Sequence, residues 1–319
     1  MTAGFLVVDK PAGVTSHDVV AAVRAVTGIP KVGHTGTLDP FATGVLPLAL
    51  GRSTRLIQFL DESVKVYDAR IRLGSATDTG DPTGTVIRTA PVPTATRDEV
   101  EQVLRGFLGD RMQEPPAYSA VKVAGRPMYQ YARKGEVVSA PARKINIAAL
   151  DLLEYGEGLL RVRIHCSRGT YARVLADEIA IALGSAGHLE ALCRDRSGPF
   201  YLEDAMSFTG LAEIVAAREG HEWRHVLLGR RGEERVPWRP REEVLAALAP
   251  KVRSELQCLS HLPLVDVGAV DAKRVRAGGG VPVPPRGVAV GGRYLVVAGA
   301  DVVAVAESSA RGPKALRVV

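Results

Sequence analysis

Apolar side chains recur at helical spacing in three parts of the chain. After Thr15 and Asp18, which form a capping-box pattern, apolar positions repeat every three or four residues until Gly28. This pattern predicts a helix over residues 17–27, ended by the glycine. Two further helices are predicted in the same way, over residues 97–108 and 171–183.

Other apolar runs are predicted to be strands. Residues 4–8 are apolar, and residues 64–73 alternate in part; a polar turn at 74–84 then leads to a return strand at 85–89. Two more strands, 145–153 and 159–166, are predicted to pair around Gly156-Glu157-Gly158. Strands and helices follow one another without a regular βαβ repeat. The predicted fold class is therefore α+β, with a mixed, largely antiparallel sheet flanked by helices.

The composition of the sequence changes twice after the last predicted helix. Residues 218–241 are polar, with 7 Arg against 4 Glu. Beyond His261, glycines and prolines precede three short apolar runs, which predict a small β-barrel. These runs are residues 294–298, 302–306 and 315–319. Three parts are therefore predicted: a first domain at 1–208, a basic linker or insertion at 209–261, and a small domain at 262–319.

Composition narrows the class of protein. The 319 residues are enough for two domains, and a hydrophobic content of 46% supports a sizeable core. Three cysteines far apart in the sequence do not make a disulfide framework and suit a reducing compartment. No basic and apolar leader opens the chain, and no apolar run approaches the ~20 residues of a membrane span. A cytoplasmic protein that does not enter a membrane is predicted.

Positive charge is concentrated in one region. The net charge is +6, and residues 111–174 alone hold 11 Lys and Arg against 5 Asp and Glu. Five tyrosines are interspersed there: Tyr118, Tyr129, Tyr131, Tyr155 and Tyr171. Basic groups for phosphates combined with rings for unstacked bases favour RNA over a membrane as the partner.

The stretch from Gly33 to Gly44 carries the candidate chemistry. Three glycines, a proline and three threonines predict an irregular loop, which contains one carboxylate, Asp39, and one imidazole, His34. A compact loop on a rigid scaffold can hold a reactive group in fixed geometry. From spacing alone, a carboxylate that caps a turn beside Pro40 is the commoner case.

This stretch and several others, in order, are similar to the motifs of one family. Residues 33–40 and 42–46 resemble the catalytic motif of the bacterial tRNA pseudouridine-55 synthases, the TruB-like family. The other matching stretches are Asp9 to Ser16, Tyr67 in its Lys-Val-Tyr context, Pro115 to Lys122, Gly125 to Tyr129, and Cys166 to Arg173. The resemblance covers residues 4–208, and residues 262–319 resemble the PUA-type RNA-binding domain in position and size.

The resemblance implies an enzyme that isomerises the uridine at position 55 in the tRNA T-loop to pseudouridine. The reaction moves the base from N1 to C5 without redox change or group transfer, so no cofactor is expected. Asp39 is implied as the nucleophile, and the sequence leaves open whether it attacks the sugar or the base. Burial alone raises a carboxyl pKa and a guanidinium lowers it, so Arg173 is the implied partner rather than an ordinary surface arginine. Tyr67 is implied as a general base or a stacking group, the alternative being a half-buried strand tyrosine.

The family also implies how the RNA is held. The target base must be flipped out of the folded T-loop, with His34 filling the space and Tyr171 lining the pocket. Lys10 is expected to support the loop or a phosphate. Basic and aromatic groups are expected to contact the T-arm, namely Lys122, Arg126, Tyr129 and Arg133. The expected partner is tRNA alone, without an obligate protein partner, bound by a monomer.

Three rival functions are weighed against this interpretation. A guide-RNA-dependent pseudouridine synthase would use the same chemistry, and a non-catalytic RNA-binding or RNA-folding protein would not need Asp39. A zinc peptidase is suggested by His221-Glu222-Trp223-Arg224-His225, which matches H-E-x-x-H. The charged Arg224 and the polar surroundings make a solvated basic segment the preferred interpretation, and no metal site is predicted.

Overall fold

The computed structural model describes residues 3–61, 63–218, 220–229 and 236–319. The three helices predicted from spacing are confirmed as α1 (Ser16–Thr27), α2 (Arg97–Arg105) and α4 (Ala172–Ala182). Thr15 and Asp18 form the predicted capping box of α1, and Gly28 ends the helix in the left-handed conformation at φ 68°.

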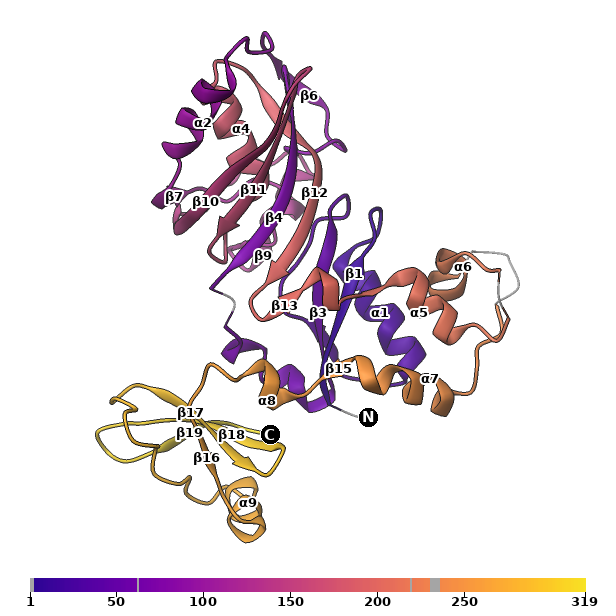
Figure 1. The fold of residues 1–319 in the computed structure, drawn as a ribbon, viewed down its shortest axis with the longest axis vertical. Coiled ribbons are helices and arrows are strands. Elements are labelled where there is room, and N and C mark those ends of the chain that lie inside the picture. The colour runs from indigo at the N-terminus through magenta and orange to yellow at the C-terminus, as the bar shows by residue number, and fades with distance from the viewer. Residues whose placement is uncertain (1–2, 62, 219, 230–235) are drawn as a thin grey trace.

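The largest sheet runs in the order β14-β1-β3-β12-β4-β11-β10-β7 (Figure 1). Its strands are β14 (Met206–Ser207), β1 (Gly4–Lys10), β3 (Thr43–Leu50), β12 (Gly187–Ser197), β4 (Lys65–Leu73), β11 (Leu159–Cys166), β10 (Arg143–Gly156) and β7 (Gly109–Gln113). Three short strands pair beside this path, namely β2 (Val32–His34), β13 (Phe200–Tyr201) and β15 (Val252–Arg253). Among the described strands of this largest sheet, only β1–β14 and β12–β3 pair in parallel, so the prediction of a largely antiparallel sheet is confirmed.

Strand β12 is central to the sheet, and the sequence pattern did not predict it. It pairs in parallel with β3 on one side and antiparallel with β4 on the other. Two irregularities in its register, at Leu189/Ala191 and Arg194/Arg196, interrupt the alternation of its side chains. A strand that is bulged twice and rich in charged residues has no clear period of two, which is why the pattern failed there.

Both faces of the first strand are buried, which explains its continuous apolar sequence. Leu6 and Val8 point into the core that also contains the buried face of α1. Phe5 and Val7 point into a second core, which includes Leu295 of the C-terminal sheet. The first strand therefore lies between two layers, and a strict apolar–polar alternation is not expected of it.

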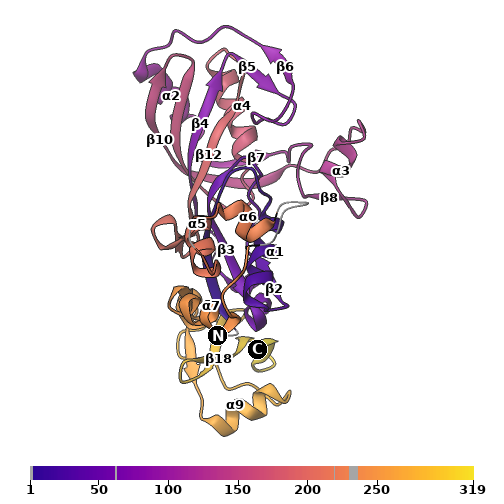
Figure 2. The same cartoon turned by 90° about the vertical axis from the view of Figure 1, so that its right-hand side faces the viewer.

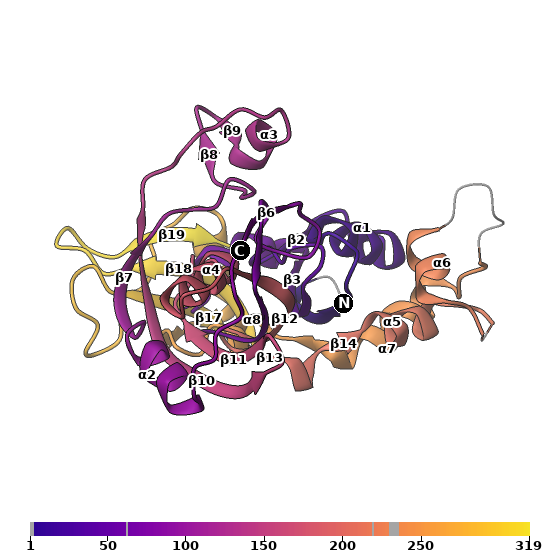
Figure 3. The ribbon, with the colours of Figure 1, turned by 90° about the horizontal axis from the view of Figure 1, so that it is seen from above.

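Two small hairpins extend from the main sheet. The strands β5 (Ser75–Thr77) and β6 (Val86–Thr89) form the first, and only its second strand was predicted. The strands β8 (Lys122–Val123) and β9 (Arg126–Pro127) form the second, which leads into the short helix α3 (Met128–Ala132). Figures 2 and 3 show that this second hairpin and α3 stand out from the body of the molecule.

The described part of residues 209–261 is packed rather than extended. It contains α5 (Phe208–Val215), α6 (Trp223–Leu228), α7 (Arg241–Leu248) and α8 (Glu255–Cys258), besides the strand β15. Val215, Val226 and Val244 belong to the same core as α1. Of the two alternatives predicted for this segment, a basic linker or an insertion, the packing fits an insertion, because its apolar residues join the core of the first domain. The domain boundaries themselves stay a prediction.

The C-terminal part forms its own sheet, in the order β16-β17-β18-β19. The three predicted apolar runs are β17 (Arg293–Ala298), β18 (Asp301–Glu307) and β19 (Lys314–Val318), while β16 (Leu264–Asp266) was not predicted. With the helix α9 (Ala269–Arg276), the sheet makes a small β-rich unit consistent with the predicted PUA-like domain. Among the described residues, no helix is long and apolar enough to cross a bilayer.

Candidate active site

The loop that carries Asp39 lies between two paired strands. It leaves β2 and enters β3, and these strands pair antiparallel with His34 opposite Leu48. Gly33 and His34 are therefore in a strand, although the sequence predicted an irregular loop from Gly33 onward. Between the strands the Asp39 carbonyl accepts a hydrogen bond from the Ala42 N–H at 3.1 Å. The loop is short, and both of its ends are fixed in the sheet.

Donors from β1 and α1 hold the middle of this loop. The Ser16 hydroxyl donates to the Leu38 carbonyl at 3.0 Å and accepts from the Leu38 N–H at 2.9 Å. The Lys10 ammonium donates to the carbonyls of Val14 at 2.8 Å, Pro11 at 2.9 Å and Pro40 at 3.2 Å. The backbone groups on either side of Asp39 are thus paired with fixed partners, as buried backbone groups must be.

The position of Lys10 corrects its assignment as an RNA contact. Its side chain is fully buried, and its three donors already meet three carbonyls, so it cannot reach a phosphate. Burial lowers the pKa of the Lys10 ammonium to about 8, and the nearby Asp39 carboxylate partly opposes this effect. Lys10 therefore supports the loop, which was the other expectation from the sequence.

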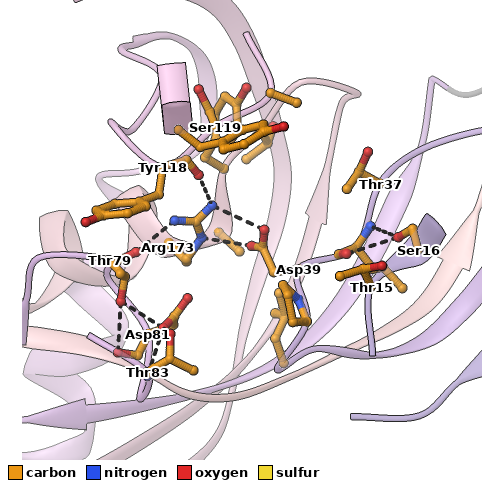
Figure 4. A pocket seen from close by; sticks show the side chains of 18 of the residues that line it. Thr15, Ser16, Thr37, Asp39, Thr79, Asp81, Thr83, Tyr118, Ser119 and Arg173 are labelled. Carbon is orange, nitrogen blue, oxygen red and sulfur yellow. Dashed lines mark hydrogen bonds and ion pairs between the residues drawn. The ribbon is translucent and has the colours of Figure 1, made fainter. Parts of the chain in front are cut away.

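Arg173 is the ion-pair partner of Asp39, as the resemblance implied. Its Nε lies 2.8 Å from Asp39 Oδ2, and its Nη2 lies 3.3 Å from Oδ1, so the pair is bidentate (Figure 4). Arg173 stands in the first turn of α4 and is 6% exposed, whereas the Asp39 side chain is 33% exposed. The buried guanidinium holds the carboxylate in one orientation while leaving it open to the cavity.

Arg173 also donates two hydrogen bonds to backbone carbonyls. Its Nη1 donates to the Thr79 carbonyl at 2.7 Å, and its Nη2 donates to the Tyr118 carbonyl at 2.8 Å. Thr79 lies in a turn built around the buried Asp81, whose Oδ1 accepts from the Thr79 hydroxyl at 2.8 Å and from the Thr83 N–H at 2.9 Å. Figure 4 shows this turn beside the Asp39–Arg173 pair. Arg173 therefore joins the turn, the segment before β8 and the Asp39 loop.

The pair opens into a cavity of about 760 Å³. Parts of the chain that are far apart in sequence line it: the start of α1, the Asp39 loop, β4, the Thr79 turn, the segment before β8, residues at α3, the start of α4 and Leu192 of β12. Predicted site residues that line it are His34, Asp39, Tyr67, Tyr129, Arg133, Tyr171 and Arg173. A volume of this size, with a few polar groups converging in it, is typical of a small-ligand site.

Lys122 and Arg126 do not line the cavity. They lie on the β8–β9 hairpin, where both side chains are exposed. On the same projection, the Arg133 guanidinium carbon lies 5.4 Å from the centre of the Tyr129 ring. The hairpin, which stands out from the body of the molecule in Figure 2, carries these two cations beyond the residues that line the cavity.

Tyr67 faces the cavity from β4 and is buried. Burial raises the pKa of its phenol to about 12, and the Arg194 guanidinium partly opposes the rise. At neutral pH the phenol is therefore un-ionised in this structure. Both roles expected for Tyr67, general base and stacking group, stay predictions.

The sequence did not single out several residues that complete the site. Arg194, on the unpredicted strand β12, donates to three carbonyls of the Asp39 loop and of β3. Thr79 and Tyr118 meet Arg173 only through their carbonyls, which any residue type could supply. Side-chain identity thus gives no signal for them.

The H-E-x-x-H segment does not have the geometry of a zinc site. Helix α6 begins at Trp223, so His221 precedes it and the two histidines are not one helical turn apart on a common helix. Their ring centres are 6.1 Å apart, and the rings stand edge to face. Arg224 instead donates to the Ala12 carbonyl at 3.1 Å. The described residues hold no group of three or more metal-binding side chains.

The family model and the curated relatives that match this chain agree with one another. The sequence model described as "TruB family pseudouridylate synthase (N terminal domain)" matches residues 24–172. The chain is 46% identical over 213 residues to tRNA pseudouridine synthase B of Aromatoleum aromaticum, covering 67% of this chain and 69% of that protein. It is 39% identical over 317 residues to tRNA pseudouridine synthase B of Geobacter sulfurreducens, covering 96% and 94% of the two chains.

A solved structure shares the fold along almost the whole chain. It is the crystal structure of a Cbf5-Nop10-Gar1 complex, with a TM-score of 0.65 and 26% identity. The match covers 99% of this chain and 84% of that chain. Both the largest sheet and the C-terminal sheet therefore have counterparts in that solved structure.

Proposed function

This chain belongs to the TruB family of pseudouridylate synthases and isomerises uridine to pseudouridine in tRNA, and we propose that its target is the T-loop uridine at position 55, with Asp39 as the nucleophile. The observation that carries the proposal is the bidentate Asp39–Arg173 pair at the wall of the 760 Å³ cavity. A carboxylate held in one orientation by a buried guanidinium is ready to attack a substrate atom without first reorganising.

The reaction makes few further demands on the protein. The N1–C1′ bond breaks, the base turns while it stays in the cavity, C5 joins C1′ and loses its proton, and N1 takes up a proton. Neither an oxidant nor a second substrate takes part. The neutral ring of Tyr67 and the ring of Tyr171 would hold the base by its faces and edges during the turn. The cavity keeps the detached base beside the sugar.

The RNA must present its target base outside the stack. Arg133 and Tyr129 at the cavity, with the exposed Lys122 and Arg126 on the hairpin, offer cations for phosphates and a ring for an unstacked base. His34, at the end of β2, lies where it could occupy the space that the flipped base leaves. These contacts would select a folded loop by its shape and the target by its access to Asp39.

We further propose that the enzyme acts on tRNA as a monomer in the cytoplasm, without a guide RNA or protein partner. The names of the relatives, tRNA pseudouridine synthase B, support tRNA as the substrate. A guide-dependent enzyme would require a second RNA before it modified tRNA. Activity of the purified chain on tRNA alone therefore separates the two functions.

The decisive experiment measures tritium release from an unmodified tRNA transcript labelled at uridine C5. Wild type, Asp39→Asn and Asp68→Asn are compared; Asp68 belongs to another bidentate pair, with Arg161 at 2.9 and 2.7 Å, outside the cavity lining. We expect release by wild type and Asp68→Asn, mapped to the T-loop uridine, and none by Asp39→Asn with RNA binding intact. Equal release by wild type and Asp39→Asn would remove Asp39 from the mechanism, and release only with added guide RNA would favour the rival enzyme.

A further inference from the structure

Arg194 is a buried cation that serves the catalytic loop and touches neither solvent nor a carboxylate. Its side chain is fully buried on β12. None of the ion pairs among the described residues includes it. Burying a charge without an opposite charge is costly, and an apolar side chain of similar volume is often at least as stabilising. Stability of the sheet alone does not account for an arginine here.

Arg194 donates to backbone carbonyls on both arms of the loop, and its guanidinium also interacts with the Tyr67 phenol, where it opposes the rise in pKa. Nη2 donates to Gly36 at 3.1 Å and Nη1 donates to Thr37 at 3.3 Å, both shortly before Asp39. Nε donates to Val45 at 2.8 Å, in the strand that follows. One planar guanidinium therefore ties the arm that enters the loop to the strand that leaves it, with Asp39 between them.

The backbone is shaped to admit this contact. Arg194 lies opposite Gly44 where β12 pairs with β3, and a Cβ on Gly44 would stand 2.4 Å from the Arg194 carbonyl oxygen. A Cβ on Gly36 would stand 3.7 Å from Arg194 Nη1 and 2.9 Å from Lys65 Nζ. Gly44 therefore lets β3 approach the backbone of Arg194 closely, whereas a side chain at Gly36 would be crowded by Lys65 and not by Arg194.

We propose that Arg194 is a positioning residue of the isomerisation, which fixes the loop so that Asp39 meets Arg173 and faces the cavity. The inference rests on the proposed role of Asp39. Lys10 complements Arg194 by holding the Pro40 carbonyl, just beyond Asp39. Without the guanidinium, the carbonyls of Gly36 and Thr37 would lose their donors, and the loop would move toward other donors or water.

The test compares Arg194→Lys and Arg194→Met with a matched control, Arg196→Lys, in the full chain. Arg196 lies on the same strand and donates to the Gly198 carbonyl at 2.8 Å, but it does not line the cavity. Single-turnover rates on labelled tRNA and the Kd for tRNA are measured, corrected for the folded fraction from urea unfolding. We expect Arg194→Met to lower the rate about 100-fold with Kd changed less than about threefold, Arg194→Lys to lie between, and Arg196→Lys to match wild type.

Hydrogen exchange of the peptide that contains residues 35–42 gives a readout independent of activity. We expect faster exchange there in both Arg194 variants than in wild type or Arg196→Lys. Unchanged exchange in folded variants would overturn the proposal, and so would faster exchange with an unchanged rate. If Asp39→Asn remained fully active, the proposed function would fail, yet exchange in the Arg194 variants would still report whether Arg194 holds the loop.

Discussion

Replacing Arg173 by methionine tests the core of the site, because the side-chain length is nearly kept while both bonds to Asp39 are lost. Hydrogen bonds to charged groups contribute about 1.5–3 kcal/mol each, so two of them set a range of roughly 3–6 kcal/mol. The Asp39 side chain is 33% exposed, and water can replace part of this interaction, so the lower end applies. A loss of about 3 kcal/mol in transition-state stabilisation corresponds to a rate about 100-fold lower.

The assay is single-turnover tritium release from tRNA labelled at uridine C5, with tRNA affinity measured alongside. Arg161→Met is the matched control, since Arg161 forms a bidentate pair with Asp68 but is 43% exposed. We expect the control to keep its rate and to lose no more than about 1 kcal/mol of stability. A folded Arg173→Met protein that binds tRNA and reacts within about tenfold of wild type would refute the reasoning.

Three further predictions concern the loop, the sheet and the RNA. The pKa of Lys10 is lowered to about 8 in the folded protein, so above that pH the unfolded chain binds more protons than the folded chain. The free energy of unfolding of wild type, relative to that of Lys10→Met, should therefore rise by about 2 kcal/mol from about pH 7.5 to about pH 9.5. Urea unfolding at the two pH values measures this difference. Gly44→Ala should destabilise the protein by at least about 2 kcal/mol more than Gly184→Ala. Both glycines have positive φ, but the added Cβ would lie 2.4 Å from a backbone oxygen at Gly44 and would meet no atom within 4 Å at Gly184. Equal losses of stability would contradict this. The logarithm of tRNA affinity should fall linearly with the logarithm of salt concentration between about 50 and about 200 mM, and a flat plot would argue against phosphate contacts.

The sequence predicted those parts of the site whose requirements are local. The helix α1 was found because its cap, its apolar spacing and its final glycine all lie within 14 residues, from Thr15 to Gly28. Asp39 and Arg173 were found through short motifs that resemble those of a known family, and the structure brings them together across 134 positions. The residue types alone did not distinguish Asp39 from a turn-capping carboxylate.

What the sequence missed depends on partners distant in the chain. Lys10 was expected at a phosphate or at the loop, and only its three carbonyl partners decide between these roles. The helices α5, α6 and α7 are only six to eight residues long, so their apolar positions do not show burial until α1 is placed beside them. Arg194 lies in a strand whose bulges hide the alternation of side chains, so neither the burial of Arg194 nor the direction of its side chain could be predicted.

The geometry of the site depends on one seam in the largest sheet, the short pairing between β12 and β3. Asp39 belongs to the half built on β1 and β3, whereas Arg173 belongs to the half in which α4 packs on β12 and β4. Strand β12 joins the halves, and its parallel pairing with β3 comprises only Cys193 opposite Thr43 and Arg194 opposite Gly44. A shift at so short a seam would change the distance between the carboxylate and its guanidinium directly. The side chain of Arg194 ties the loop to this same seam, so the strand that sets the spacing of the two halves also sets the orientation of Asp39.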